Sequence, residues 1–188
     1  MAANQPPWPR EWLMTDERIG DRLWDSIEML PSGAGIVFRH YRLADAARLE
    51  MGGRIAQLAR ERHLLLAVAG SVALAEQLGA ALVHHPDTQG ALPWSMAVHN
   101  DHQAALARSA GAALAFVAPV HATRSHPEVT VLGPERAAAL AGQAGCPAIA
   151  LGGMDAERFA RLDAAHPGAF HGYAGIDCWL AGGPGLRT

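Results

Sequence analysis

The sequence predicts an α/β protein: a compact (β/α)8 TIM barrel with short helices, forming one domain. Short apolar runs alternate with longer amphipathic stretches along the chain, the pattern of repeated strand–helix units around a parallel sheet. Eight apolar runs have the length of a strand, and eight parallel strands with helical crossovers favour a closed barrel. An open doubly wound sheet is the alternative, but no GxGxxG motif follows the first strand to support it.

The predicted strands are separated by turns that contain glycine or proline. They cover residues 11–15, 34–39, 63–68, 80–84, 94–98, 112–118, 147–151 and 169–173. Residues 1–10 are polar and rich in proline and are predicted to be a flexible leader, whereas residues 11–188 form the barrel domain. The 188 residues fall just short of the ~200 that are usual for this fold, so the helices must be short.

Several helices are recognisable from their apolar spacing and their end signals. After the second strand, apolar residues recur every three or four positions and form one core-facing stripe: Leu43, Ala47, Met51, Ile55 and Leu58. Asn100 and Gln103 have the spacing of a capping box, and Gly111 is a typical stop signal after that helix. Pro134 suits a first helical turn, and Gly145 ends that helix before the seventh strand.

The charge pattern limits the classes of partner. The formal net charge is −3, and the charged residues are spread along the chain. There is therefore no basic stripe for nucleic acid and no polybasic patch for a membrane surface. No segment reaches the ~18 consecutive apolar residues that a membrane span needs. Nucleic-acid and membrane partners are not expected, whereas homo-oligomerisation stays open because exposed and core apolar residues look alike in a sequence.

Lysine and cysteine usage narrows the chemistry further. All fifteen basic residues are arginine, which excludes a lysine Schiff base and a P-loop lysine. The two cysteines, Cys146 and Cys178, lie far apart in apolar surroundings and form no CxxC pair. This pattern favours buried thiols in a reduced, cytoplasmic protein.

Candidate site residues follow the predicted strands, because a β/α barrel carries its functional groups at the carboxyl ends of its strands. The segment after the sixth strand offers the hydroxyls of Thr123 and Ser125, the Arg124 guanidinium and the His126 ring. All of these groups can donate hydrogen bonds to phosphate oxygens. A solvated polar loop is the alternative interpretation.

Two glycines, Gly152 and Gly153, directly follow the seventh strand, and a helix starts soon after them. Backbone amides can approach an anion closely there, and the helix terminus adds a favourable partial charge, although a tight turn alone would also need glycine. Other strand ends add His99, Gly172 and Gly175 as candidate ligand-binding residues. The sequence thus predicts a phosphate site between residues 118–127 and this glycine turn.

Imidazole and carboxylate groups also follow the fourth strand, in His84, His85 and Asp87. Adjacent residues of a strand point to opposite faces, so at most one of the two histidines faces the site. Without an HExxH motif or paired Cys/His spacing, this cluster gives little support for a zinc ion.

Taken in order, these segments resemble the thiamine phosphate synthase and TenI family of barrels, over about Trp12 to Leu180. The likeness rests on WLMTD at 12–16, IVFR at 36–39, LGAALVH at 78–84, VH at 98–99, APVHATRSHP at 118–127 and ALGGM at 150–154. The third of these is similar to the family's GADGVHL, the fifth to its GPVF.T.TK loop and the last to its AIGGI. Each piece is short, but the order and spacing are specific.

The resemblance implies an enzyme of thiamine biosynthesis that joins hydroxymethylpyrimidine diphosphate to a thiazole phosphate, with Mg²⁺ assisting the departure of pyrophosphate. By this resemblance, Thr123 and Ser125 would contact the thiazole phosphate or the diphosphate, and Gly152 and Gly153 would contact the phosphate. Arg39 would face the diphosphate. Fixed positive charge suits this step because negative charge develops on the pyrophosphate as it leaves.

The chain departs from the family pattern on the metal and diphosphate side. The family's Asn-Asp pair after the third strand, whose acid binds Mg²⁺, aligns with Ala69 and Gly70, which have no ligating side chain. Asp87 corresponds only loosely to a second family aspartate. Two family lysines align with Tyr41 and His126, and a histidine is only partly charged at neutral pH. We therefore expect weakened Mg²⁺ binding, with Asp87 as the candidate ligand, and synthase activity that is weak or needs an unusual metal site.

Two other functions stay open. The TenI branch resembles a thiazole tautomerase, and its proton-transfer histidine aligns with Pro119, while His121 lies two residues along on the same strand face. The candidate catalytic residues are therefore His121, His126 and Arg39, and His99 is a further acid/base candidate. The last alternative is a noncatalytic protein that binds a phosphorylated ligand.

Overall fold

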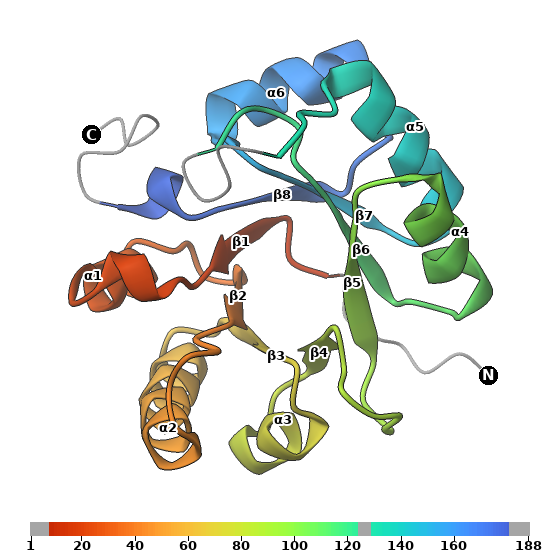
Figure 1. Cartoon of the computed structure of the whole chain (residues 1–188). Helices are drawn as coiled ribbons and strands as arrows, with labels where there is room; N and C mark the ends of the chain where they lie inside the picture. The colour runs from red at the N-terminus through yellow and green to blue at the C-terminus, as the bar shows by residue number, and fades with distance from the viewer. Residues whose placement is uncertain (1–7, 124–128, 181–188) are drawn as a thin grey trace.

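A closed barrel of eight parallel strands forms the centre of the protein (Figure 1). The computed structural model describes residues 8–123 and 129–180. The strands are β1 (Glu11–Met14), β2 (Gly35–Phe38), β3 (Leu65–Ala69), β4 (Leu82–His84), β5 (Trp94–Val98), β6 (Leu114–Val117), β7 (Ala148–Leu151) and β8 (Gly172–Gly175). Each strand pairs with its neighbours in sequence, and β1 pairs with β8 to close the ring. The predicted α/β barrel is confirmed.

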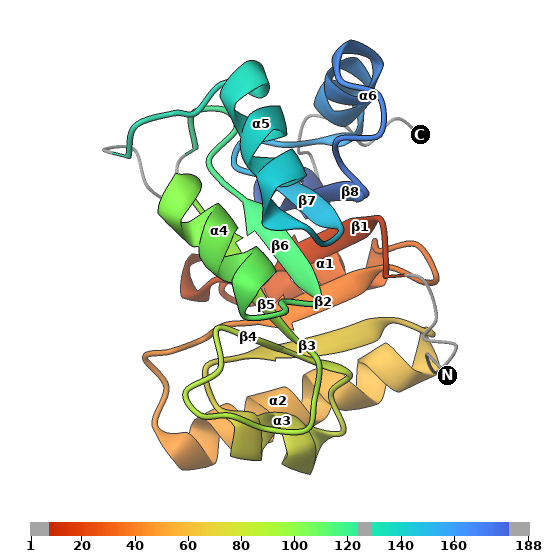
Figure 2. The same ribbon diagram turned by 90° about the vertical axis from the view of Figure 1, so that its right-hand side faces the viewer.

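Six α-helices of the described residues surround the barrel (Figures 1 and 2). They are α1 (Arg22–Glu28), α2 (Asp45–Glu61), α3 (Val72–Leu78), α4 (Asp101–Ser109), α5 (Pro134–Ala144) and α6 (Ala156–Ala165), with short 3-10 helices at Glu17–Ile19 and Asp177–Trp179. The connection from β4 to β5, residues 85–93, has no helix, because Pro86, Gly90 and Pro93 interrupt this short segment. None of the helices described is long and apolar enough to cross a membrane.

Alternation along the strands divides the core into two layers. In β1, Trp12 and Met14 belong to the cluster inside the barrel, whereas Leu13 packs in the layer between strands and helices. Trp12 and Phe116 meet edge to face with ring centroids 5.6 Å apart. Because such large side chains fill the barrel, its interior is packed rather than a pore, and a ligand site belongs at the ends of the strands.

The predicted helix ends agree with the structure. The Asn100 side chain accepts a hydrogen bond from the Gln103 N–H at 3.0 Å, and the Gln103 side chain accepts one from the His99 N–H at 2.7 Å. Pro134 starts α5, and Gly145 ends it with a left-handed φ of +70°. The cap on α4 matters for the site, because it fixes the backbone of His99 at the end of β5.

The eighth strand begins later than predicted. The sequence predicts a strand over 169–173, whereas β8 covers Gly172–Gly175. Gly168 has a φ of +75° and lies in a turn that occupies the residues before the strand. Gly172 is consequently at the amino end of β8, where a Cβ atom would lie 1.9 Å from the carbonyl oxygen of Arg10. Its glycine permits close packing at the end of the barrel opposite the carboxyl ends.

Candidate functional site

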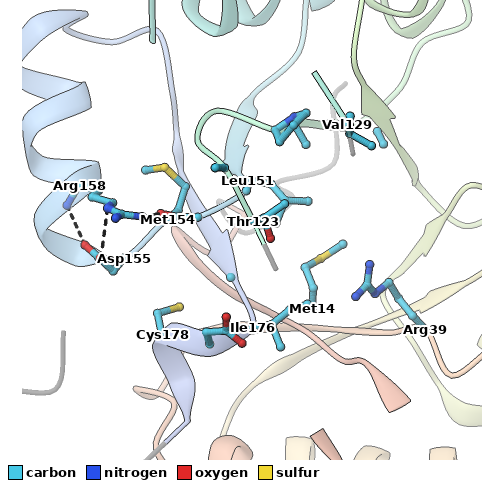
Figure 3. Close-up of a pocket in the computed structure, with 18 of the residues that line it drawn as sticks. Met14, Arg39, Thr123, Val129, Leu151, Met154, Asp155, Arg158, Ile176 and Cys178 are labelled. Carbon is cyan, nitrogen blue, oxygen red and sulfur yellow. Dashed lines mark hydrogen bonds and ion pairs between the residues drawn. The ribbon is translucent and has the colours of Figure 1, made fainter. Parts of the chain in front are cut away.

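A cavity of about 810 Å³ opens at the carboxyl ends of the strands (Figure 3). Residues from strand ends and the loops after them line most of it, among them Met14, Arg39, His84, His99, Thr123, Leu151, Gly152, Gly153 and Gly175. Figure 3 shows the pair formed by Arg158 and Asp155 on one side and Arg39 on the opposite side, with Met14 and Thr123 between them. The cavity therefore has a guanidinium group at each of two opposite ends.

The turn after β7 packs so closely against the loop after β6 that only glycine fits. Gly152 has a φ of +96°, and a Cβ atom there would lie 2.7 Å from the Cα of Pro119. Gly153 has a φ of +60°, and its Cβ atom would lie 2.6 Å from the carbonyl oxygen of Ala122. The Gly153 N–H donates to no acceptor in the described part of the chain, so it can serve an anion.

The first turn of α6 adds two further groups to this end of the cavity. Asp155 caps the helix by accepting from the Arg158 N–H at 2.8 Å. The Arg158 guanidinium donates to the Gly153 carbonyl oxygen, and its Nε lies 3.8 Å from a carboxylate oxygen of Asp155. A phosphate beside Gly153 would thus meet an N–H donor, a helix N-terminus and a guanidinium.

Arg39 is fixed by neighbouring backbone and carboxylate oxygens at the opposite end. Its Nε donates to the Thr15 carbonyl oxygen at 2.7 Å, and its Nη2 lies 3.2 Å from Asp16 Oδ2. Burial lowers the pKa of Arg39, but an arginine stays protonated near neutral pH. Burial would also raise the pKa of Asp16, but hydrogen bonds and charges from Arg18 and Arg39 outweigh it and lower that pKa. Arg39 is therefore a fixed cation with a preset direction.

His84 is a neutral hydrogen-bonding group in the cavity wall. Its Nδ1 lies 3.0 Å from the hydroxyl of Ser95, and burial lowers its pKa to about 3. The next residue, His85, leaves the strand with a φ of +50°, and its Nε2 accepts from the Ala97 N–H at 2.7 Å. His84 thus lines the cavity, while the ring of His85 is hydrogen-bonded to the backbone of β5.

His99 and His121 differ in their access to the cavity. His99 lines it, and its Nδ1 lies 2.6 Å from the Ala118 carbonyl oxygen. A carbonyl can only accept, so Nδ1 carries the proton and Nε2 of the neutral ring has the lone pair. His121 is half-buried outside the lining, and burial, with a contribution from the Arg158 charge, lowers its pKa.

The structure brings together six of the predicted site residues: Arg39, His99, Thr123, Gly152, Gly153 and Gly175 line the same cavity. Gly172 lies at the other end of the barrel, as its strand position shows. Asp87 lines a separate surface groove between α3 and the β4–β5 connection, so it is not a ligand in this cavity. Arg124, Ser125 and His126 lie outside the described residues.

Several lining residues are missing from the sequence prediction. Arg22 at the start of α1, Asp177 and Cys178 after β8, and Arg158 all line the cavity. Arg158 carries the clearest local signal, because it lies three residues after the helix-capping Asp155 and so in the first turn. Burial raises the pKa of the Cys178 thiol to about 12, so this cysteine is not a thiolate nucleophile at neutral pH.

The residues around the end of β3 do not fit a Mg²⁺ ion. Ala69 and Gly70 offer only carbonyl oxygens, which already accept from the Arg48 guanidinium at 2.6 Å and from the Asp87 N–H at 2.8 Å. The Asp87 carboxylate accepts from the Val72 N–H at 3.1 Å. No group of three or more His, Cys, Asp or Glu side chains that could hold a metal occurs among the described residues. Mg²⁺ prefers several free oxygen ligands in octahedral geometry.

Solved structures of other proteins have a fold similar to this barrel. A thiamine phosphate pyrophosphorylase from Pyrococcus furiosus is 22% identical, with a TM-score of 0.75 over 89% of this chain and 85% of that chain. A muconate cycloisomerase from Azorhizobium caulinodans is 12% identical, with a TM-score of 0.55 over 92% of this chain and 55% of that chain. At these identities the likeness shows the fold alone.

Sequence comparison identifies the family. No curated protein matches the chain at a significant level. The family described as thiamine monophosphate synthase matches residues 13–169, which include the carboxyl ends of seven of the eight strands, among them β7 with its glycine turn. The chain belongs to the thiamine monophosphate synthase family.

Proposed function

We propose that the protein binds a thiazole phosphate in this cavity and joins it slowly to hydroxymethylpyrimidine diphosphate, as a transferase of thiamine biosynthesis. The observation that carries this proposal is the pairing of two cationic ends in one cavity, Arg158 beside the Gly153 turn and Arg39 opposite. A reaction between two phosphorylated substrates needs two anion sites with space for the heterocycles between them.

The thiazole phosphate fits the end formed by Gly152, Gly153 and α6. The N–H group of Gly153, which has no acceptor among the described residues, and the helix terminus supply donors that need no rearrangement. The Thr123 side chain lines the cavity between the Arg158–Asp155 pair and Arg39 (Figure 3), where it would contact the bound heterocycle. This arrangement would leave the ring facing Met14 and the opposite end.

The diphosphate of the second substrate fits the end formed by Arg39. In the transfer, the bond between the pyrimidine methylene carbon and the pyrophosphate oxygen breaks, and the pyrophosphate keeps the electron pair. The thiazole nitrogen supplies the pair for the new carbon–nitrogen bond. Arg39 is set to stabilise the charge that develops on the leaving group. We expect a slow reaction, because the carbonyl oxygens of Ala69 and Gly70 already accept hydrogen bonds from Arg48 and Asp87.

A direct assay tests this proposal. Purified protein is incubated with both substrates, and thiamine phosphate is measured chromatographically. We expect slow product formation, an increase in Tm with thiazole phosphate, and a lower binding affinity in Thr123→Val. Thr130→Val is the matched control, because Thr130 is exposed and outside the cavity lining. Absence of product with no thiazole phosphate binding would refute the proposal, whereas binding without product would leave only a binding protein.

A second candidate function, proton transfer on a thiazole phosphate, is favoured by His99. Its Nδ1 is committed to the Ala118 carbonyl oxygen, which leaves Nε2 as the nitrogen that can exchange a proton with a ligand in the cavity. We expect solvent deuterium incorporation into the thiazole substrate if this function is present, and its loss in His99→Gln. His102→Gln on the exposed face of α4 is the control. Incorporation at the same rate in His99→Gln would exclude this role.

A further inference from the structure

We infer that the Arg39 end of the cavity binds its phosphate-bearing ligand without a divalent cation, and that Arg48 holds Arg39 in place by binding the strand ends. This inference rests on the proposed function for the identity of the ligand. Arg39 would neutralise the negative charge of the ligand, and Arg48 would position Arg39.

Arg48 reaches from the first turn of α2 to the carboxyl ends of two strands. Its Nη2 donates to the Ala69 carbonyl oxygen at 2.6 Å and to the Arg39 carbonyl oxygen at 3.3 Å. The guanidinium carbon lies 5.6 Å from the ring centroids of both Phe38 and Tyr41. A guanidinium bound in this way joins the ends of β2 and β3 and fixes the backbone of Arg39.

Hydrogen bonds at the end of β3 also occupy the carbonyl oxygens that a cation would need as ligands. The Ala69 carbonyl accepts from Arg48 and also from the Ser71 N–H at 3.2 Å, and the Gly70 carbonyl accepts from the Asp87 N–H at 2.8 Å. Arg48 itself is a positive charge that is partly buried here, so a metal ion at this place would be repelled at short range. The positive charge of Arg48 and the lack of available oxygen ligands therefore both disfavour a metal ion at the end of β3.

Arg39 supplies the compensating charge directly. Its Nε and Nη2 are occupied by Thr15 and Asp16, whereas its Nη1 has no acceptor among the residues that the structure describes. Figure 3 shows this guanidinium at the edge of the cavity. Because two of its three nitrogens are anchored, the remaining N–H groups are held in one direction, so little conformational entropy is lost when an anion binds.

The test measures binding of inorganic pyrophosphate to the full-length protein by calorimetry, once with excess Mg²⁺ and once with EDTA. We expect Kd in EDTA to be equal to or tighter than Kd with Mg²⁺, and Arg39→Gln to weaken it by about 10-fold or more in both buffers. Arg60→Gln, an exposed position on α2, makes the same charge change away from the cavity and should leave Kd unchanged. Binding that requires Mg²⁺, or no pyrophosphate binding in either buffer, would overturn the inference.

The positioning role of Arg48 is tested separately with Arg48→Met and Arg48→Lys. We expect Arg48→Met to weaken pyrophosphate binding in EDTA by about 3-fold or more, while the Tm increase with thiazole phosphate persists at the other end of the cavity. Arg48→Lys should restore part of the affinity. Equal loss of both ligands would mean that Arg48 only supports the fold. If Arg48→Met does not fold, Arg48→Lys still tests the positioning role, and the comparison of the wild-type protein in Mg²⁺ and in EDTA still decides whether a metal is needed.

Failure of this inference is distinguishable from failure of the proposed function. If thiamine phosphate forms and pyrophosphate binds only with Mg²⁺, the transferase proposal stands and the metal-free site is wrong. If pyrophosphate binds in EDTA but thiazole phosphate does not bind and no product forms, the anion site stands and the transferase proposal is wrong.

Discussion

Replacing Gly152 with alanine places a methyl carbon 2.7 Å from the Cα of Pro119, in a residue whose φ is +96°. Left-handed backbone costs a residue with a Cβ atom about 1–2 kcal/mol. A collision with backbone, which cannot move aside as a flexible side chain can, typically adds about 1–3 kcal/mol. We therefore expect Gly152→Ala to lower the free energy of unfolding by about 2–5 kcal/mol.

Gly168→Ala is the matched control for this change. Gly168 has a φ of +75°, but no atom lies within 4 Å of the position of its Cβ, so it carries only the backbone cost of about 1–2 kcal/mol. Urea denaturation of the wild type, Gly152→Ala and Gly168→Ala, followed by tryptophan fluorescence, gives the loss in free energy of unfolding for each variant. If Gly152→Ala is no less stable than Gly168→Ala, the close approach between the turn after β7 and the loop after β6 does not constrain the site.

Three other changes test separate parts of the structure. Asn100→Ala removes the cap of α4 and should cost about 1 kcal/mol in a denaturation experiment; no measurable cost would mean that the side-chain cap is not formed. The pKa of His84 falls from 6.5 in the unfolded chain to about 3 in the folded protein. Between these two pH values the unfolded state binds more protons than the folded state, so the free energy of unfolding decreases as pH falls below about 6.5. His84→Gln should flatten that dependence, and an unchanged slope between wild type and variant would contradict the assignment. With its pKa near 12, Cys178 should react slowly with iodoacetamide at neutral pH until the protein is unfolded; rapid labelling of the native protein at Cys178 would contradict its burial.

The barrel was predictable where local signals were sharp. The strand predicted over 94–98 is β5, because Pro93 precedes it and the cap of Asn100 follows it. The strand predicted over 169–173 starts three residues later, because the turn around Gly168 and the pairing of Gly172 with the neighbouring strand depend on contacts distant in sequence. Apolar composition alone does not locate a strand within such a run.

Those residues of the site that directly follow a strand could be predicted from the sequence. Arg39 and His99 line the cavity because each directly follows a strand whose carboxyl end faces it. The roles of Arg48 and Arg22 were missed, since they depend on how α2 and α1 dock onto the barrel. A helix position shows which face is apolar, but it does not show which strand end a long side chain can reach.

The helix-free connection between β4 and β5 makes one seam of the barrel weaker than the others. These two strands pair over only two residues, Val83 with Trp94 and His84 with Ser95, whereas β5 and β6 pair over four. With no crossover helix to shield this short ladder, its amides should exchange with solvent before those of the rest of the barrel. His84 and His99 stand at the ends of these two strands, so transient opening of the seam would widen the cavity wall between them. The glycine turn follows β7 and is separated from this seam by β6.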